Sequence, residues 1–148
     1  MKHLNTNITL YKEKDNFRVK KKKKIKTWIG KVTKKEGYRI EQINYFLVSD
    51  KTLLDLNKSQ LNHNYYTDII TFDMGEEEGV VEADLYISYD RVKDNAKVFH
   101  VKHIEEMKRV MIHGVLHIMG YKDKSQADIQ AMRNKEDSSL RLYKKING

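Results

Sequence analysis

The 148-residue sequence contains no cysteine and no proline, and it has no apolar run long enough to span a membrane. Without cysteine there can be no disulfide, no thiolate ligand and no cysteine nucleophile, so a metal site has to use histidine and carboxylate side chains. The N-terminal stretch MKHLNTNITLYKEKD also lacks the apolar core of a signal peptide. We therefore expect a soluble, cytoplasmic protein.

Negative charge is scarce relative to positive charge. The chain has 29 lysines and arginines against 21 aspartates and glutamates, a formal net charge of +8. Such a protein favours polyanionic partners, most commonly nucleic acid, although a lysine-rich surface can also serve solubility alone. The charge is concentrated in VKKKKKIK (Val19–Lys26), which could follow RNA phosphates or simply form a solvated helix face. GEEEG (Gly75–Gly79) is a local acidic patch.

The length and the apolar content favour one domain that spans residues 1–148. Hydrophobic residues make up 39% of the chain, which is enough for a core at this length. No internal repeat or low-complexity linker divides it. Apolar or alternating runs predict four strands, and the acidic GEEEG turn should join the last two as a hairpin. The predicted strands are Ile8–Tyr11, Ile43–Asp50, Thr67–Met74 and Val80–Asp90.

Helical periodicity lies between and after these strands. Apolar residues three and four positions apart predict a helix before Gly37, a short helix capped by Asp50 and another after Ser88. Two more helices follow, one over about 104–119 and a last one near Ser125, where SQAD resembles a capping box. We predict an α+β fold with one mixed, mostly four-stranded sheet, several helices and a metal site at the end of the central helix.

The stretch HGVLHIMGYKD suggests that metal site. His113 and His117 stand four positions apart on the predicted helix, so both rings project from one face. Gly120 can adopt a left-handed conformation that ends the helix and lets Asp123 return as a third ligand. Three ligands leave a coordination position open, as in catalytic zinc sites. Such histidine pairs also arise by chance or in core hydrogen bonding, but the helix-weakening Gly114 indicates close approach of a substrate or a strand.

The residue types also narrow the chemistry. In the helical metalloprotease motif a glutamate directly follows the first histidine as general base, and here Gly114 occupies that position. Peptide hydrolysis by that mechanism is therefore disfavoured. A Lewis-acidic metal with a bound water, on a basic protein, suits a phosphodiester substrate better. Two histidines and one carboxylate also match the facial triad of non-haem iron oxygenases, so iron stays open as the metal.

HGVLHIMGYKD resembles the signature of the YbeY family, whose members are bacterial ribosomal RNA maturation factors described as metal-dependent endoribonucleases. The usual family pattern is H-G-x-L-H-L-x-G-Y-D-H. Two further blocks resemble family motifs, LNKSQLNHNYYTDIITFD (Leu56–Asp73) and EADLYIS (Glu82–Ser88), and Glu136 matches an acidic position in the last helix. The blocks occur in the family order and cover most of the chain from about Ile43 onward.

The resemblance implies a zinc-dependent, single-strand-specific endoribonuclease that matures ribosomal RNA, including the 3′ end of the small-subunit RNA, and acts in ribosome quality control. It implies one zinc ion per chain, or another divalent metal, held by His113, His117 and, where the family has its third histidine, Asp123. We take the two histidines as catalytic. Asp84 matches the acidic residue of the family's G-D-I strand and could orient a ligand histidine or a water, or simply face solvent. The implied partners are ribosomal RNA and the small ribosomal subunit, without DNA or membrane; the oligomeric state stays open.

One departure from the family pattern bears on catalysis. The arginine of the family's L-N-x-x-Y-R block falls on Leu61, and leucine can contact neither a phosphate nor a developing charge. Either a nearby cation replaces it, with His63 and Arg91 as candidates, or the catalytic step is slower. Two alternatives to a nuclease therefore stand: a non-catalytic ribosome-assembly factor with a structural metal site, and a metallohydrolase of another substrate.

Overall fold

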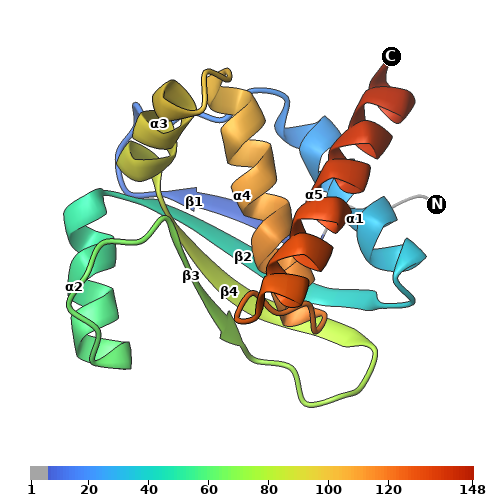
Figure 1. Cartoon of the computed structure of the whole chain (residues 1–148), viewed down its shortest axis with the longest axis horizontal. Coiled ribbons are helices and arrows are strands. Elements are labelled where there is room, and N and C mark those ends of the chain that lie inside the picture. Colours follow the sequence, from blue (N-terminus) through green and yellow to red (C-terminus); the bar gives the residue numbers. More distant parts are fainter. Residues whose placement is uncertain (1–6) are drawn as a thin grey trace.

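The structure is a computed structural model that describes residues 7–148. Within these residues a four-stranded mixed sheet carries five helices (Figure 1). The strands are β1 (Ile8–Lys12), β2 (Arg39–Val48), β3 (Ile69–Asp73) and β4 (Val80–Ser88). The helices are α1 (Lys22–Lys35), α2 (Asp50–Leu61), α3 (Tyr89–Val98), α4 (His103–Ile118) and α5 (Gln126–Asn147). The predicted α+β class, the four strands and the central helix are confirmed.

The sheet has the strand order β1-β2-β4-β3. β2 pairs in parallel with both β1 and β4, whereas β3 and β4 form the predicted antiparallel hairpin around the GEEEG turn. Parallel neighbours need a crossover connection, and α1 supplies the one between β1 and β2. β3 is consequently an edge strand, and one side of it is free to border a cleft.

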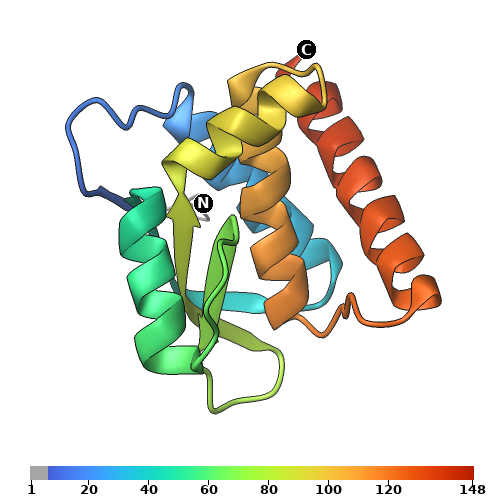
Figure 2. The same cartoon turned by 60° about the vertical axis from the view of Figure 1, so that its left-hand side comes forward.

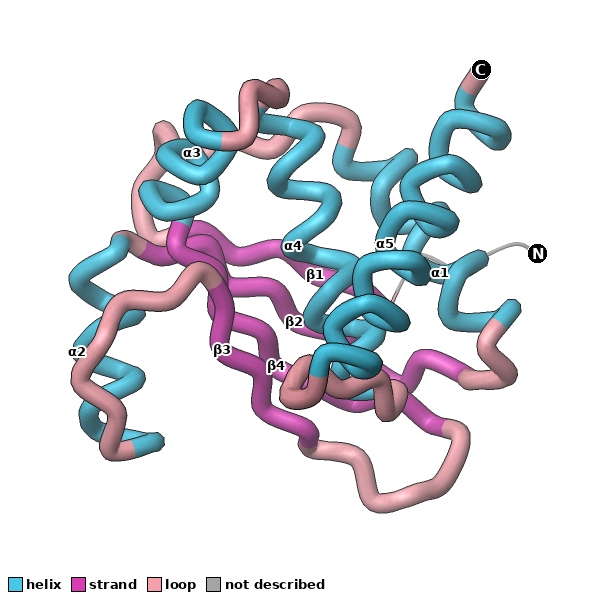
Figure 3. The backbone as a smooth tube through the Cα atoms, viewed as in Figure 1, coloured by secondary structure: helices cyan, strands magenta, loops and turns pink. Residues whose placement is uncertain are grey.

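The sheet separates two apolar clusters, as Figures 2 and 3 show through the placement of α2 apart from the other helices. The larger cluster fills the space between the sheet and the helices α1, α4 and α5 and includes Trp28, Tyr45 and Met111. The Tyr45 hydroxyl donates a hydrogen bond of 2.9 Å to the Met111 carbonyl oxygen, which ties α4 to β2. The smaller cluster, with Leu53 of α2, lies on the opposite face. No helix of the described residues is long and apolar enough to cross a membrane.

One local expectation is wrong. The N-cap of α2 is Ser49, whose hydroxyl accepts the Thr52 N–H, and not Asp50. Asp50 is instead drawn into long-range contacts, because its carboxylate accepts hydrogen bonds from the Ser88 hydroxyl at 3.0 Å and from Arg91 at 2.7 Å. These contacts join the starts of α2 and α3, which no local capping pattern can reveal. The capping box at Ser125 is confirmed.

Gly114 allows α4 to lie directly on the sheet. A Cβ atom at this position would collide with the Leu85 side chain of β4 and would lie 2.7 Å from Cδ1 of Ile69 on β3. The close approach expected from the sequence is therefore that of two neighbouring strands. Because His113 precedes this glycine, the contact sets the position of His113 relative to β3.

Replacing Gly114 by valine should destabilise the protein by about 2–3 kcal/mol. Extra methyl groups in a packed core typically cost about 1–3 kcal/mol, and a branched side chain here meets the buried Leu85 and the partly buried Ile69 at once. Gly114→Ala should cost less, because its smaller clash is offset by about 1 kcal/mol of helix propensity. Urea unfolding measures both variants. A valine variant as stable as the wild type would contradict the close packing.

Candidate metal centre

The structure brings the three predicted ligands to one cleft. His113, His117 and Asp123 all line a hollow of about 450 Å³, which β3 and the loop after α2 also border. His113 is half-buried and His117 is exposed one turn further along α4. Gly120 has a φ of 107°, and the chain turns there as expected from the sequence. As a result, Oδ2 of Asp123 lies 3.7 Å from Nε2 of His113.

In this structure the side chains of His113, His117 and Asp123 do not surround a common point at which a metal ion could bind. Among residues 7–148, no group of three or more histidine, aspartate or glutamate side chains is placed to hold a metal ion. The donor types fit a divalent cation nonetheless, because two imidazoles and a carboxylate form a usual zinc ligand set. Asp123 lies on the loop between α4 and α5, and its side chain is 49% exposed.

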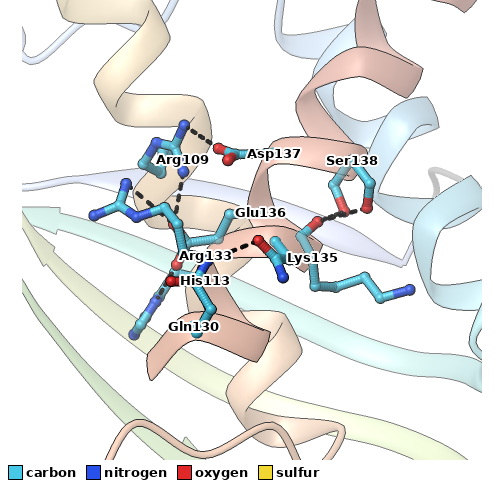
Figure 4. A network of polar contacts seen from close by, with 10 residues as sticks. Arg109, His113, Gln130, Arg133, Lys135, Glu136, Asp137 and Ser138 are labelled. Carbon is cyan, nitrogen blue, oxygen red and sulfur yellow. Dashed lines mark hydrogen bonds and ion pairs between the residues drawn. The ribbon is translucent and has the colours of Figure 1, made fainter. Parts of the chain in front are cut away.

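A buried carboxylate from α5 fixes the ring of His113. Oε2 of Glu136 lies 2.6 Å from Nδ1 of His113, and Glu136 is only 5% exposed (Figure 4). Because an ionised carboxylate can only accept hydrogen bonds, Nδ1 carries a proton, and in the neutral ring Nε2 therefore has the free lone pair. That lone pair faces Asp123 and the cleft. A carboxylate behind a histidine is the usual support of a metal ligand, since it sets both the tautomer and the ring orientation.

Arg109 of α4 keeps Glu136 ionised. Its guanidinium donates to Oε1 of Glu136 at 2.8 Å and to Oδ1 of Asp137 at 2.7 Å (Figure 4). Burial by itself raises the pKa of Glu136, but the hydrogen bonds from His113 and Arg109 outweigh burial and hold this pKa below its usual value. The carboxylate is therefore charged at neutral pH and available to polarise His113.

The cleft stabilises positive charge at His113. Burial by itself lowers the pKa of His113, but the hydrogen bond to Glu136 and the charges of Glu136, Asp68 and Asp123 raise it above its usual value. Asp68 precedes β3 and lines the hollows on both sides of His113. Burial raises the pKa of Asp68, and the charge of His113 opposes that shift. An environment that favours an imidazolium also favours a metal cation in its place.

Asp84 lies on the other face of the sheet. Side chains alternate along a strand, so Ala83 and Leu85 of β4 face α4 while Asp84 points away from it. Its carboxylate accepts a 3.1 Å hydrogen bond from Asn44 of β2. The structure therefore does not bring Asp84 to the two histidines, and the contact that orients His113 comes from Glu136 instead.

The structure also separates the two cations considered as replacements for the family arginine. Leu61 is 40% exposed and lines the cleft beside His113. Arg91 is engaged by Asp50 at 2.7 Å and does not line the cleft. His63 does line it, and its Nδ1 lies 3.1 Å from the Tyr65 hydroxyl. Of the two candidates, only His63 is placed at the cleft.

Sequence reasoning gave Glu136 no role at the site, although a signal was present. Met132, Glu136, Ser139 and Tyr143 are the buried residues of α5 and repeat at helical spacing. A glutamate on an otherwise largely apolar helix stripe indicates a buried partner, because a lone buried carboxylate is costly. Nothing in the sequence identified that partner as His113, which lies 23 positions earlier.

The fold and the cleft define a small α+β protein whose central helix presents a histidine pair, one member of which is held by a buried carboxylate. The sequence model of the Endoribonuclease YbeY family matches residues 7–144. The chain belongs to the YbeY family, whose members are named as endoribonucleases.

Known relatives agree with this assignment. The chain is 47% identical to the Endoribonuclease YbeY of Cytophaga hutchinsonii over 137 residues, which cover 93% of this chain and 96% of that protein. It is 45% identical to the Endoribonuclease YbeY of Flavobacterium psychrophilum, covering 86% of this chain and 91% of the relative. The solution structure of a Thermotoga maritima protein shares the fold, with a TM-score of 0.65, 24% identity and coverage of 95% and 93% of the two chains.

Proposed function

We propose that this protein is a zinc-dependent endoribonuclease specific for single-stranded RNA. We further propose that it works in the cytoplasm with the small ribosomal subunit, matures ribosomal RNA including the 3′ end of the small-subunit RNA, and acts in ribosome quality control. The observation that carries the proposal is the geometry of His113. Its Nδ1 is held by buried Glu136 while its Nε2 faces Asp123 in a cleft shared with His117.

Each residue of the site has a defined part in this proposal. His113, His117 and Asp123 would hold the metal ion, which would supply Lewis acidity and a lowered pKa for a water molecule. Glu136 keeps the proton of His113 on Nδ1, so that Nε2 stays available as a donor. The hydrogen bonds from His113 and Arg109 keep Glu136 ionised. His63 lies at the cleft where the family arginine is replaced by Leu61, and could donate a hydrogen bond to a substrate phosphate.

Metal removal tests the proposal. Chelation followed by dialysis should abolish the cleavage of a fluorescent single-stranded RNA, and one equivalent of zinc should restore it. Manganese, magnesium and iron, added in parallel, would identify the preferred metal. A duplex of the same sequence and a single-stranded DNA should remain intact. Cleavage that persists in the chelated protein, in a preparation free of contaminating nuclease, would contradict the proposal.

A second candidate function is favoured by Leu61. An exposed leucine in the cleft supplies no charge to a phosphate, which suits an assembly factor that uses its metal site structurally. A deletion strain separates the two functions. If a His113→Ala variant restores growth and ribosome profiles as well as the wild type does, the protein acts by binding. If it fails while still associating with the small subunit, catalysis is required.

A further inference from the structure

A long hollow leads away from the metal cleft between α4 and α5, which lie side by side in Figures 1 and 2. It begins as a space of about 430 Å³ that includes His113 and Asp123. It continues as a larger space of about 850 Å³ that reaches the end of α5. The two spaces adjoin each other, because they share the lining residues Phe99, Glu106, Arg109 and Arg133. We call the two spaces together the α4–α5 trough.

Several acidic side chains of the trough are engaged by other residues. Glu105 forms an ion pair of 2.9 Å with Lys108, and Asp137 pairs with Arg109 at 2.7 Å. Glu106 is buried, and burial raises its pKa, with a further contribution from the charge of Asp68. In the outer part of the trough, which reaches the end of α5, two of the three acidic side chains are thus paired with cations.

Most of the basic side chains of the trough are not held in close ion pairs. Lys102, Arg141 and Lys144 are exposed and form no ion pair with any residue of the described chain. Arg133 has a 3.7 Å contact with Glu136, whose carboxylate is already held more closely by Arg109. We call these four residues the trough cations. With Arg109 they face three acidic side chains in the outer part of the trough, the space that reaches the end of α5, where positive charge is therefore in excess.

The trough cations suit a polyanion in extended form. Arg133, Arg141 and Lys144 line the trough from one side of α5, and at 1.5 Å per residue they span roughly 16 Å. At about 3.4 Å per stacked nucleotide that length accommodates roughly five nucleotides. Lys102 also borders a further hollow with Arg18 and Lys20. The basic surface therefore continues to Lys20, the first lysine of the Val19–Lys26 stretch.

An exposed aromatic side chain favours a single strand over a duplex. Phe99 lies on the wall of the trough with 55% of its surface exposed, beside Val101, which is 44% exposed. Aromatic rings bind nucleic acid by stacking on the face of an unpaired base. In a duplex these faces are covered by neighbouring bases, so the ring would have no partner there.

We propose that the α4–α5 trough binds the single-stranded RNA segment that flanks the cleaved bond. The trough cations contact successive phosphates, and Phe99 stacks on an unpaired base. The inference rests on the proposed function for the identity of the ligand. It concerns contacts made by the trough cations and Phe99, none of which is a proposed metal ligand, so it can be tested without cleavage.

A charge-neutralising double variant tests the trough. Arg141→Gln/Lys144→Gln should weaken the binding of a nuclease-resistant 2′-O-methyl RNA of about 20 nucleotides by about tenfold at low salt, and should reduce the log–log salt slope by about 1.4. The matched control is Lys31→Gln/Lys34→Gln. It removes the same charge from exposed positions of α1 outside the trough and should stay within about twofold of the wild type. Fluorescence anisotropy at several salt concentrations measures both.

A second variant tests the aromatic contact. Phe99→Ala should lower the affinity for single-stranded RNA by about fivefold or more, because the loss of one base–aromatic stack costs at least that much binding free energy. The binding of a duplex of the same sequence should be unchanged. Equal losses for single strand and duplex would contradict stacking.

The outcomes separate this inference from the function on which it rests. Equal losses of RNA affinity in the two double variants would show that only net charge matters, and would overturn the proposal that the trough binds RNA. Equally tight binding of polyglutamate of matched charge would point to an acidic protein and overturn the RNA assignment. A wild-type protein that binds RNA through the trough but does not cleave it would refute the proposed function alone. If the Arg141→Gln/Lys144→Gln variant cleaves RNA and binds it as tightly as the wild type, only the proposal that the trough binds RNA is refuted.

Discussion

Replacing His117 by alanine should abolish RNA cleavage and leave the fold intact. The proposed metal needs both histidines of α4, and a bound metal strongly lowers the pKa of its water towards neutrality, so activity should fall by several orders of magnitude without it. His117 is exposed, and surface substitutions of this kind usually change stability by less than about 0.5 kcal/mol. RNA cleavage, zinc titration by calorimetry and urea unfolding of the metal-free protein would measure the three expectations.

The matched control for His117→Ala is Lys31→Ala, which truncates an exposed helical residue of α1 away from the cleft. It should keep full activity and zinc affinity. A His117→Ala protein that binds zinc with wild-type affinity would rule out His117 as a ligand. One that loses zinc but keeps cleaving would rule out the metal-dependent mechanism.

Replacing Glu136 by alanine should weaken both the fold and the metal site. Glu136 is buried and accepts hydrogen bonds from His113 at 2.6 Å and Arg109 at 2.8 Å. Breaking a buried ionic contact of this kind costs about 3–5 kcal/mol. We expect about 3 kcal/mol, the lower end, because Arg109 keeps its contact with Asp137. At this chain length the melting temperature should fall by roughly 6–12 °C, and zinc affinity should fall about 10- to 100-fold because the carboxylate no longer orients His113.

Glu136→Gln separates the two effects of Glu136. Glutamine keeps the volume of the side chain and one oxygen acceptor, so the loss of stability should be smaller than that of the alanine variant. It lacks the negative charge that polarises His113, so zinc affinity should still fall. If both variants bind zinc like the wild type, Glu136 has a purely structural role. Calorimetric zinc titration and thermal unfolding of the metal-free proteins distinguish these cases.

Local patterns predicted most of the fold because the signals are short in range. Helical spacing located α4, strand alternation located β4, and the capping box located the beginning of α5. The cap of α2 was assigned one residue too late because Asp50 is held by Ser88 and Arg91, which lie about forty positions away. A contact of that range leaves no local trace in the sequence.

The sequence by itself determined that His113 and His117 share a helix face and that Gly120 turns the chain, since both depend on backbone geometry within a few residues. Only the tertiary structure decided which carboxylates surround them. It placed Glu136 of α5 behind His113 and turned Asp84 to the opposite face of the sheet. The reason is that the packing of α5 against α4 and the register of β4 arise from contacts between distant segments. The sequence could therefore indicate two ligands, but not the buried carboxylate that orients one of them.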